Sequence, residues 1–264
     1  MRKIITLTTD FGLQDYYVSA MKGVILSIMP EARLIDVSHQ IPAQDIMAGA
    51  WVLKNAAPLF PANTVHLVVI DPGVGTSRKP IALQMQDQFF VGPDNGIFSL
   101  LTENEDFKAV ELTEKKFWQT NLSSTFHGRD IFAPVAAHIC NGADLDQLGP
   151  SINELQTYRW ASPIADQDGI QGWIIHIDRF GNLITNITHS LIDEVTQGQP
   201  LKLYVGNTII DKIVDTFGAV VEGEPAAYIG SSGMLEIAIN KGNAEQMLGA
   251  QKGAQISLVL QHND

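Results

Sequence analysis

The sequence predicts an α/β N-terminal domain with a central, mostly parallel sheet, followed by a smaller all-β C-terminal domain with a barrel-like or sandwich-like sheet. Up to about residue 150, runs of strand-like residues alternate with segments of helical period, which is typical of a sheet covered by helices. From Gly169 onward, short strand patterns follow one another with Gly and Asn turns between them. The polar stretch between these regions predicts a linker. We therefore expect domains at 1–155 and 169–264, joined by a linker at 156–168.

In the first domain, apolar and β-branched runs predict five strands, at 3–10, 32–38, 64–71, 81–85 and 88–94. A helix is predicted between the first two strands, with Asp15 as its cap, because the apolar residues there share one helical face: Tyr17, Met21, Val24, Ile25 and Ile28. A second helix is predicted within "IFAPVAAHIC", where we expect Cys140 to be a buried, inert thiol.

In the second domain, six shorter runs predict strands separated by turn residues. They lie at 171–178, 182–188, 201–209, 226–232, 234–239 and 254–261. Short strands at this spacing are typical of a compact sandwich or barrel.

Composition narrows the functional classes. The chain has 264 residues, of which 45% are hydrophobic, so it can bury a substantial core. A net charge of −12 argues against a nucleic-acid partner or an anionic membrane surface, because phosphate contacts need clustered Lys and Arg. With no apolar run long enough for a membrane span and no signal-peptide pattern, we expect a soluble cytoplasmic protein. A single cysteine excludes an intramolecular disulfide and a thiolate metal cluster.

Polar side chains follow several of the predicted strands. In open α/β sheets the ligand site lies beyond the carboxyl ends of the strands, so these positions are candidates for chemistry. Asp10 ends the first strand, and "HLVVIDPGVGTSRKP" delivers Asp71 and Arg78 into one short loop. "STFHGRDIFAPVAAH" places His127 just before a helix. Asp94 stands in Asp-Asn-Gly, which we interpret as a turn because Asn-Gly supplies positive φ at little steric cost.

The same residues suggest a metal-dependent alternative. Carboxylates and a histidine at strand ends can form a dinuclear hydrolytic centre, as in a metal-dependent phosphoesterase. However, Arg78 and Arg129 lie close in sequence to the candidate ligands, where a cation would oppose metal binding, and the histidines lack His-x-Asp or His-x-x-x-His spacing. Arg129 and Asp130 could instead form a helix cap and a surface ion pair. We therefore predict no metal ligands.

The second domain carries residues suited to a nucleoside. "IDRFGNLITNI" ends a strand with Asp178 and then offers Phe180 and Asn182, and an aromatic ring and a carboxamide can stack on a purine and hydrogen-bond its edge. "YIGSSGMLEIAIN" offers a glycine-flanked serine pair beginning at Ser231, followed by Glu236. Each residue also has an ordinary structural interpretation: a core phenylalanine, a turn asparagine and polar loop serines.

Six blocks together resemble the S-adenosyl-L-methionine hydroxide adenosyltransferase family, whose relatives include the fluorinase and the chlorinase. They are "TLTTDFG", "VIDPGVGTSR", "FVGPDNG", "FHGRDIFAPVAAH", "IDRFGNLITNI" and "SSGMLEIAIN", and they span nearly the whole chain in order. The resemblance implies cleavage of S-adenosyl-L-methionine to adenosine and methionine, with water or hydroxide attacking C5′ of the ribose. It also implies a catalytic triad of Asp71, Arg78 and His127.

The resemblance further implies where the substrate binds and how the protein assembles. The ribose-binding aspartate of the family corresponds to Asp10. The other implied substrate contacts are Asp178, Phe180, Asn182, Ser231 and Glu236, with the backbone near Ile239. The resemblance implies a homotrimer with sites between subunits. The leaving thioether is neutral and needs no acid, so we expect no cofactor.

Two other functions stay open within this resemblance. Where the fluorinase has a halide-binding serine, this chain has Gly128 after His127. A halide needs donors in a close-fitting pocket, whereas a basic His and an Asp suit water, so a halogenase is disfavoured. A non-enzymatic S-adenosylmethionine sensor would keep the nucleoside contacts but would not need the Asp, Arg and His set.

Overall fold

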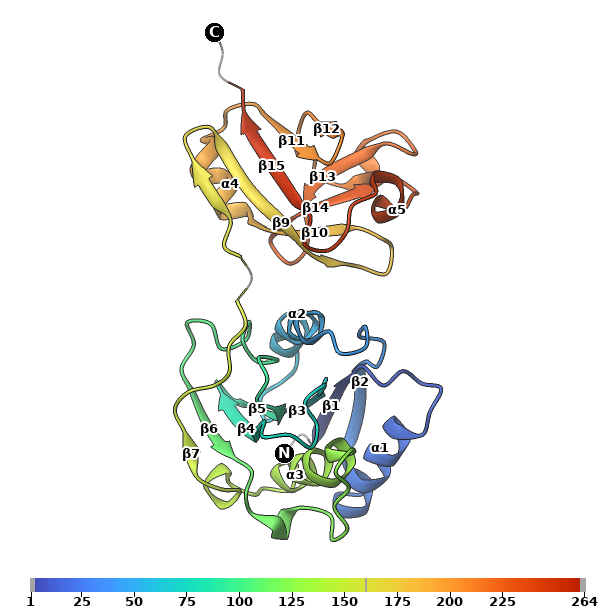
Figure 1. Ribbon diagram of the computed structural model, residues 1–264, viewed down its shortest axis with the longest axis vertical. Coiled ribbons are helices and arrows are strands. Elements are labelled where there is room, and N and C mark those ends of the chain that lie inside the picture. Colours follow the sequence, from blue (N-terminus) through green and yellow to red (C-terminus); the bar gives the residue numbers. More distant parts are fainter. Residues whose placement is uncertain (1–2, 160, 262–264) are drawn as a thin grey trace. The chain divides into compact units, whose positions relative to one another are not determined.

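A computed structural model describes residues 3–159 and 161–261, and the chain divides into two compact units, Met1–Tyr158 and Arg159–Asp264 (Figure 1). The segment 156–168, which the sequence predicts as a linker, spans this division. It includes the short strand β8 (Ile164–Asp166), which pairs with β9 (Gly169–Ile177).

The first unit contains one sheet with the strand order β2-β1-β3-β5-β4-β6-β7. Its strands are β1 (Ile4–Thr9), β2 (Arg33–Ser38), β3 (Val65–Val69), β4 (Pro80–Met85), β5 (Gln88–Pro93), β6 (Phe107–Glu111) and β7 (Ser151–Ile152). The pairings β1–β2, β1–β3 and β3–β5 are parallel, whereas β4 pairs antiparallel with β5 and β6, and β6 pairs antiparallel with β7.

This sheet is therefore mixed, and the expectation of a mostly parallel sheet is corrected. Only Gln86 and Asp87 separate β4 from β5. A connection this short can join only antiparallel neighbours, because a parallel pair needs a crossover of a dozen or more residues.

Helices cover both faces of this sheet. Helices α1 (Tyr17–Ile28) and α3 (Ala133–Cys140) pack together on one face, and α2 (Ile46–Ala56) lies on the other (Figure 1). Short helical turns occur at Ala57–Leu59, Lys115–Phe117 and Leu145–Gln147, and a π-helical turn, Gly128–Phe132, precedes α3. The burial of Cys140 is confirmed, and this burial raises the pKa of its thiol.

Helix α1 forms where the apolar spacing predicts it, with Val18, Met21 and Ile25 buried against the sheet. The predicted cap is wrong. The N-cap position is Tyr16 rather than Asp15, and no side chain caps the helix. At this start, Tyr16 and Tyr17 both pack against the ring of Phe126.

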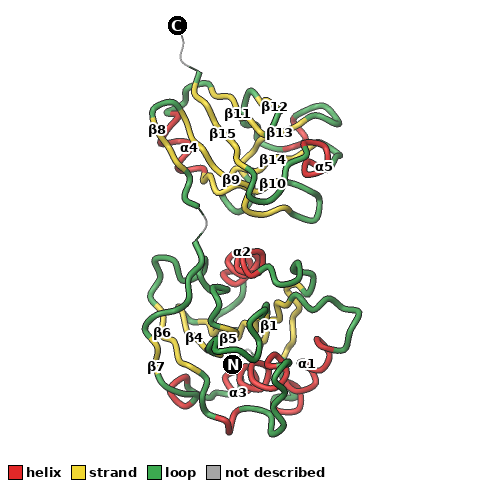
Figure 2. The backbone as a smooth tube through the Cα atoms, viewed as in Figure 1, coloured by secondary structure: helices red, strands yellow, loops and turns green. Residues whose placement is uncertain are grey.

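The second unit is built on an antiparallel sheet that is nearly barrel-like (Figure 2). The strand order is β12-β11-β15-β9-β10-β14-β13, and a bridge between Ile213 and Ala227 links the segment after β12 to β13. Besides β8 and β9, the strands are β10 (Leu183–Thr188), β11 (Leu201–Val205), β12 (Thr208–Ile210), β13 (Pro225–Ile229), β14 (Met234–Ile239) and β15 (Gln255–Leu260). Two helices that the sequence analysis did not predict, α4 (His189–Thr196) and α5 (Ala244–Leu248), and a turn at Phe217–Ala219 complete the unit.

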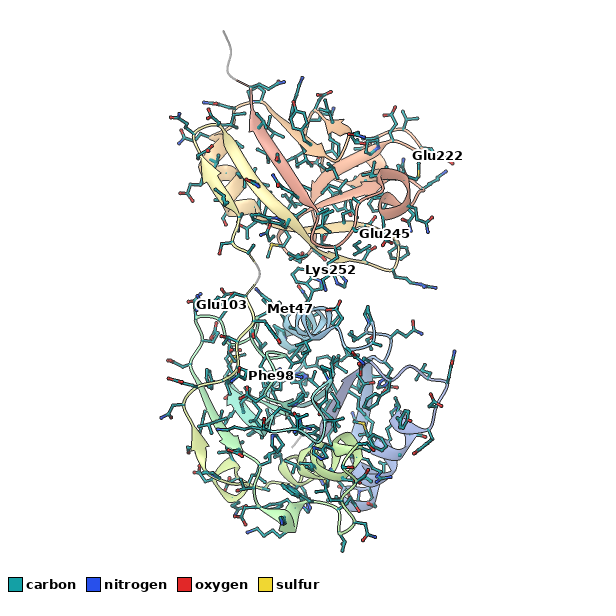
Figure 3. All side chains as sticks on the ribbon, in the orientation of Figure 1. Met47, Phe98, Glu103, Glu222, Glu245 and Lys252 are labelled. Atoms are coloured by element: carbon teal, nitrogen blue, oxygen red, sulfur yellow. The ribbon has the colours of Figure 1, made fainter. Side chains whose placement is uncertain are left out.

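Each unit has its own hydrophobic core. In the first, residues of β1 and β3 pack against α1 and α3, and in the second, residues of β9, β10 and β14 form the centre. Figure 3 shows the side chains on the ribbon, with Phe98 buried in the first unit. Within the described ranges, none of the helices has the length and apolar character needed to cross a bilayer.

Candidate active site

The candidate catalytic residues meet at the carboxyl edge of the parallel strands. Strands β1 and β3 are parallel, with Thr9 opposite Val69, so both end at the same edge. Asp10 directly follows β1, and Asp71 lies just beyond β3. Strand β5, parallel to β3 on its other side, ends immediately before Asp94. This edge is where an open α/β sheet presents its ligand site.

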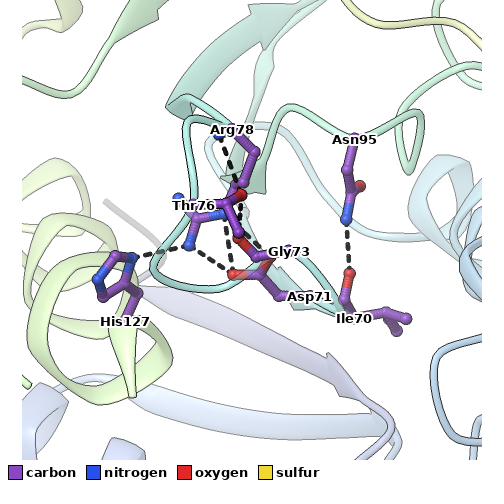
Figure 4. A network of polar contacts seen from close by, with 7 residues as sticks. All are labelled: Ile70, Asp71, Gly73, Thr76, Arg78, Asn95 and His127. Atoms are coloured by element: carbon purple, nitrogen blue, oxygen red, sulfur yellow. Dashed lines mark hydrogen bonds and ion pairs between the residues drawn. The ribbon is translucent and has the colours of Figure 1, made fainter. Parts of the chain in front are cut away.

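Asp71 and Arg78 form a bidentate ion pair across their loop (Figure 4). The Arg78 Nε donates to Asp71 Oδ1 at 2.9 Å and to Oδ2 at 3.0 Å, and Nη2 donates to Oδ2 at 2.5 Å. The Arg78 side chain is only 8% exposed and the Asp71 side chain 5%. Such forked, charge-assisted pairs are strong and geometrically specific. The loop therefore folds back to place a fixed cation beside the carboxylate.

The same guanidinium reaches His127 from the other side. Arg78 Nη2 lies 2.8 Å from His127 Nδ1 (Figure 4). Because arginine has no acceptor, Nδ1 must accept this hydrogen bond, and the proton of the neutral imidazole must then be on Nε2. Burial lowers the pKa of His127 and the Arg78 charge lowers it further, although Asp71 and Asp130 partly oppose the shift. The geometry and the charge both favour a neutral His127.

Local packing explains how the loop approaches His127. Gly75 has a φ of +76°, and a Cβ there would lie 2.5 Å from the backbone oxygen of Ser124, which is three residues before His127. Only glycine permits this approach. On the far side, the Arg78 guanidinium carbon lies 5.1 Å from the ring centroid of the fully buried Phe132. The ring and the two polar partners together restrict the guanidinium.

The other polar residues of this edge have different partners. Asp10 Oδ2 accepts from the Gln44 amide at 2.8 Å. The buried Asp94 accepts from the Gln156 amide at 2.8 Å, and burial raises the pKa of its carboxyl group. The structure therefore joins Asp71, Arg78 and His127 directly, with Asp10 and Asp94 at the same edge but outside that hydrogen-bonded set.

Arg129 and Asp130 form an ion pair, as one interpretation of the sequence predicts, but Asp130 is buried rather than at the surface, and no side chain caps Gly128–Phe132 or α3. Arg129 Nε donates to Asp130 Oδ1 at 2.6 Å, and the buried Asp130 also accepts from the Ser123 amide at 2.7 Å. Across residues 3–159 and 161–261, no three His, Cys, Asp or Glu side chains are grouped as a metal ion would require.

In the second unit, Asp178 and Asn182 close the turn between β9 and β10. Asp178 Oδ1 accepts from the amides of Phe180 at 2.8 Å and Asn182 at 2.9 Å, while its Oδ2 accepts from Asn182 Nδ2 at 2.9 Å. This contact uses one of the two Nδ2 hydrogens, so the Asn182 carboxamide keeps its oxygen as an acceptor and a second N–H as a donor. Phe180 is 74% exposed, so its ring is not a core residue.

Glu236 lies on β14 opposite Tyr228 of β13. Burial raises the pKa of Glu236 and the charge of Asp178 adds to this, against a hydrogen bond from Tyr228. Burial also raises the pKa of Tyr228. Ser231 lies in the exposed turn between these strands, and Ile239 is buried at the end of β14. The structure thus groups Asp178, Glu236 and Tyr228.

Sequence reasoning missed two residues of these sites. Tyr228 could not be found from the sequence, because no residue of its strand indicates that it lies opposite Glu236. Asn95, interpreted as part of a turn, does lie in a bend in which Gly96 has a φ of +93°. Its side chain also donates to the Ile70 carbonyl at 2.9 Å (Figure 4). Its position two residues after a parallel strand was the available signal.

Comparison with known proteins adds relatives with named activities. A protein of Salinispora tropica named (R)-S-adenosyl-L-methionine hydrolase is 40% identical over 96% of both chains. One of the same name from Thermus thermophilus is 36% identical over 98% of this chain and 100% of the relative. A fluorinase from an Actinoplanes species is 27% identical over 90% of this chain and 91% of its own length.

Solved structures and family sequence models agree with these relatives. The crystal structure of an uncharacterized conserved protein from Thermotoga maritima superposes with a TM-score of 0.91 at 36% identity, covering 97% of this chain and 99% of that one. Residues 5–149 match the N-terminal domain of the SAM hydroxide adenosyltransferases, and residues 172–257 match their C-terminal domain. Two domain matches in the correct order leave only short segments unassigned, and the chain belongs to the S-adenosyl-L-methionine (SAM) hydroxide adenosyltransferase family.

Proposed function

We propose that the protein hydrolyses S-adenosyl-L-methionine to adenosine and L-methionine, with a water-derived oxygen attacking C5′ of the ribose. The observation that carries this proposal is the contact of one guanidinium, that of Arg78, with both Asp71 and His127. The names of the relatives that are 40% and 36% identical support the same reaction.

Each triad residue has a distinct role in this proposal. Water has a pKa of about 15.7, so it needs a stabilising charge and a proton acceptor to become a good nucleophile. Arg78 supplies the charge. His127, with Nδ1 occupied by Arg78, presents an Nε2–H that donates to the nucleophile and positions it. Asp71 accepts the proton, because Arg78 binds this carboxylate with two N–H groups and a carboxylate has about four acceptor positions, so an acceptor position is left for the water.

The step balances without any other group. The oxygen–C5′ bond forms as the C5′–sulfur bond breaks, and the bonding pair goes to sulfur. The sulfonium becomes the neutral thioether of methionine, which leaves without acid assistance. One proton passes from water to Asp71. Since hydroxide character and a sulfonium neutralise each other, a site that excludes water favours this transition state over separated ions.

Substrate binding is assigned to both units. Asp10 would bind the ribose hydroxyls, since it lies at the same strand edge as Asp71. Phe180 would stack on the adenine, and its 74% exposure makes the ring available. The remaining proposed contacts are Asp178, Asn182, Ser231, Glu236 and the backbone near Ile239.

A halogenase is the weaker alternative, because position 128 is a glycine and offers no hydroxyl donor for a halide. A Cβ at this position would lie 3.3 Å from the Met21 sulfur and 3.4 Å from both Phe126 and Val69. The 3.3 Å contact is slightly tighter than an ordinary van der Waals contact and the other two are ordinary, so a serine there would need only a small shift of the Met21 side chain. The lower identity to a fluorinase, 27%, also disfavours a halogenase.

We also propose that the protein is a cytoplasmic homotrimer whose active sites form between subunits. The division of the proposed contacts between the two units supports sites shared between chains, since the triad and Asp10 lie on one unit and Phe180 on the other. The single cysteine, which is buried, suits a reducing compartment.

Product analysis of purified protein treated with EDTA tests the reaction and its proposed independence of metals and cofactors. We expect adenosine and methionine in equal amounts, with no halogenated nucleoside when chloride or fluoride is added. Activity that disappears on chelation and returns with a divalent ion would support a metal-dependent hydrolase instead. Tight S-adenosylmethionine binding without turnover would support the sensor.

A further inference from the structure

We propose that Asn95 is a positioning residue that holds the Asp71–Arg78 pair in its productive geometry through the carbonyl of Ile70. This inference rests on the proposed function for its kinetic consequences, but its structural part can be tested without activity.

The Ile70 carbonyl lies where the sheet no longer provides a partner. Strand β3 ends at Val69, and the fully buried Ile70 leads directly into Asp71. A buried carbonyl in this position needs a donor from elsewhere. Asn95 Nδ2 provides it at 2.9 Å, while Asn95 Oδ1 accepts from the Ile97 amide at 3.3 Å. The carboxamide therefore ties the peptide before Asp71 to the turn after β5.

The same turn also contacts the other end of the catalytic loop. The Asp94 amide donates to the carbonyl of Lys79 at 2.8 Å, and Lys79 directly follows Arg78. Asp94 and Asn95 thus bond to the residue before Asp71 and to the residue after Arg78. Two adjacent residues hold both ends of the loop whose side chains form the ion pair.

This turn is itself well anchored. Asp94 Oδ1 accepts from the Gln156 amide at 2.8 Å, and Ile97 is fully buried. Helix α2 packs against the side chains of Ile70 and Ile97, since a Cβ on Gly49 of this helix would lie 2.8 Å from the terminal carbon of each. A positioning residue on rigid supports can transmit a fixed geometry to its partner.

The expected effect of losing the Asn95 donor falls on turnover. Asp71 and Arg78 act on water in the proposed mechanism, whereas adenine recognition is assigned to the second unit. A displacement of about 1 Å in a catalytic group can cost about 10²-fold in rate. A shift of the Ile70–Asp71 peptide should therefore lower kcat while leaving KM nearly unchanged.

The sharpest test is Asn95→Asp, which preserves shape and the acceptor for Ile97 but turns the donor into an oxygen facing the Ile70 carbonyl. At pH 8 we expect kcat to fall by at least about 10-fold, with KM within about 3-fold of wild type. The new carboxylate at position 95 lies beside the Ile70 carbonyl and next to Asp94, so its pKa should be raised. Once protonated, this carboxyl group can again donate to the Ile70 carbonyl. The ratio of wild-type to variant kcat should therefore shrink as the pH is lowered from 8 toward 5.

Asn55→Asp is the matched control, because Asn55 Nδ2 also donates to a backbone carbonyl, that of Trp51, at 2.8 Å in α2 of the same unit. It should lose stability without a pH-dependent loss of kcat. Asn95→Ala is the second variant if Asn95→Asp does not fold, and it should lower kcat at every pH. A wild-type kcat in either Asn95 variant, or a loss in Asn95→Asp that is the same at every pH, would overturn the proposal.

A spectroscopic measurement separates this proposal from the proposed function. The ¹⁵N-labelled Arg78 Nε–H resonance, assigned with Arg78→Lys, reports the ion pair with Asp71 directly. It should shift or broaden in Asn95→Asp at pH 8 and stay in place in Asn55→Asp. An unchanged resonance would overturn the positioning role. Wild-type protein that does not hydrolyse S-adenosylmethionine would instead overturn the proposed function.

Discussion

Arg78 Nη2 and His127 Nδ1 lie 2.8 Å apart, and only the arginine can be the donor. This single contact sets the tautomer of the imidazole and removes Nδ1 as a base. With Nε2 protonated, His127 acts in the proposed reaction as a hydrogen-bond donor toward the nucleophile. The proton acceptor of the proposed reaction is then Asp71, which contacts the same guanidinium.

The first prediction concerns pH. Burial, followed by the charge of Arg78, lowers the pKa of His127 below its ordinary 6.5. Protonation would place a proton on Nδ1, break the Arg78 contact and set two cations side by side. Turnover should therefore be constant above neutrality and fall with acidification, with a midpoint below pH 6.5. A kcat profile measured with a buffer series checks this, and a midpoint above 6.5 would contradict it.

The second prediction concerns Arg78. Arg78→Ala removes the charge that stabilises hydroxide character, so turnover should fall roughly 10²–10⁴-fold. Arg78→Lys keeps the positive charge but loses the bidentate hydrogen bonds to Asp71, so its turnover should lie between that of Arg78→Ala and that of the wild type. Calorimetric affinity for S-adenosylmethionine should change little in both variants. Arg33→Ala, an exposed arginine of β2, serves as the control and should behave like wild type.

The third prediction concerns adenine binding. Phe180→Ala removes an exposed ring without opening a core cavity, so the melting temperature should be unchanged. Loss of base stacking should weaken S-adenosylmethionine binding by roughly 1–3 kcal/mol, or roughly 5–150-fold. Ile209→Ala, which removes a side chain that is 51% exposed in the same unit, is the matched control. Equal calorimetric affinities for the two variants would rule out the stacking role.

The fourth prediction concerns assembly. Co-expression of Arg78→Ala chains with Asn182→Ala chains should recover activity if each site combines the first unit of one subunit with the second unit of another. In a cyclic trimer that contains both variants, one of the three shared sites combines two intact halves, so about one third of the sites should be active. Differently tagged chains purified through both tags provide the sample. Mixed oligomers no more active than the parent variants would reject shared sites, as would a fully active monomer.

The strands at the edge of the first sheet could be predicted because each is a continuous apolar run that ends on a polar residue. That Asp71, Arg78 and His127 belong together came from the resemblance, since 49 positions separate Arg78 from His127. The parallel fraction of the sheet was overestimated. The two-residue connection at Gln86 and Asp87 was the missed signal.

Other features depend on contacts that no local pattern contains. Asn95 has the ordinary sequence of a turn, and its bond to Ile70 exists only because β5 pairs beside β3. The grouping of Glu236 with Tyr228 likewise depends on the register between β13 and β14. The predicted cap at Asp15 is wrong for a similar reason, since α1 begins beside long-range contacts of Tyr17 with Phe126 that the local sequence does not contain.

Water labelled with heavy oxygen tests the central claim most directly. If Asp71, Arg78 and His127 activate water for attack on C5′, one turnover in H₂¹⁸O must place the label in the 5′-hydroxyl of adenosine. Mass spectrometry of both products should find labelled adenosine and unlabelled methionine in the wild type, with the same product formed far more slowly by Arg78→Ala. Label in methionine, or adenosine without label, would contradict the account.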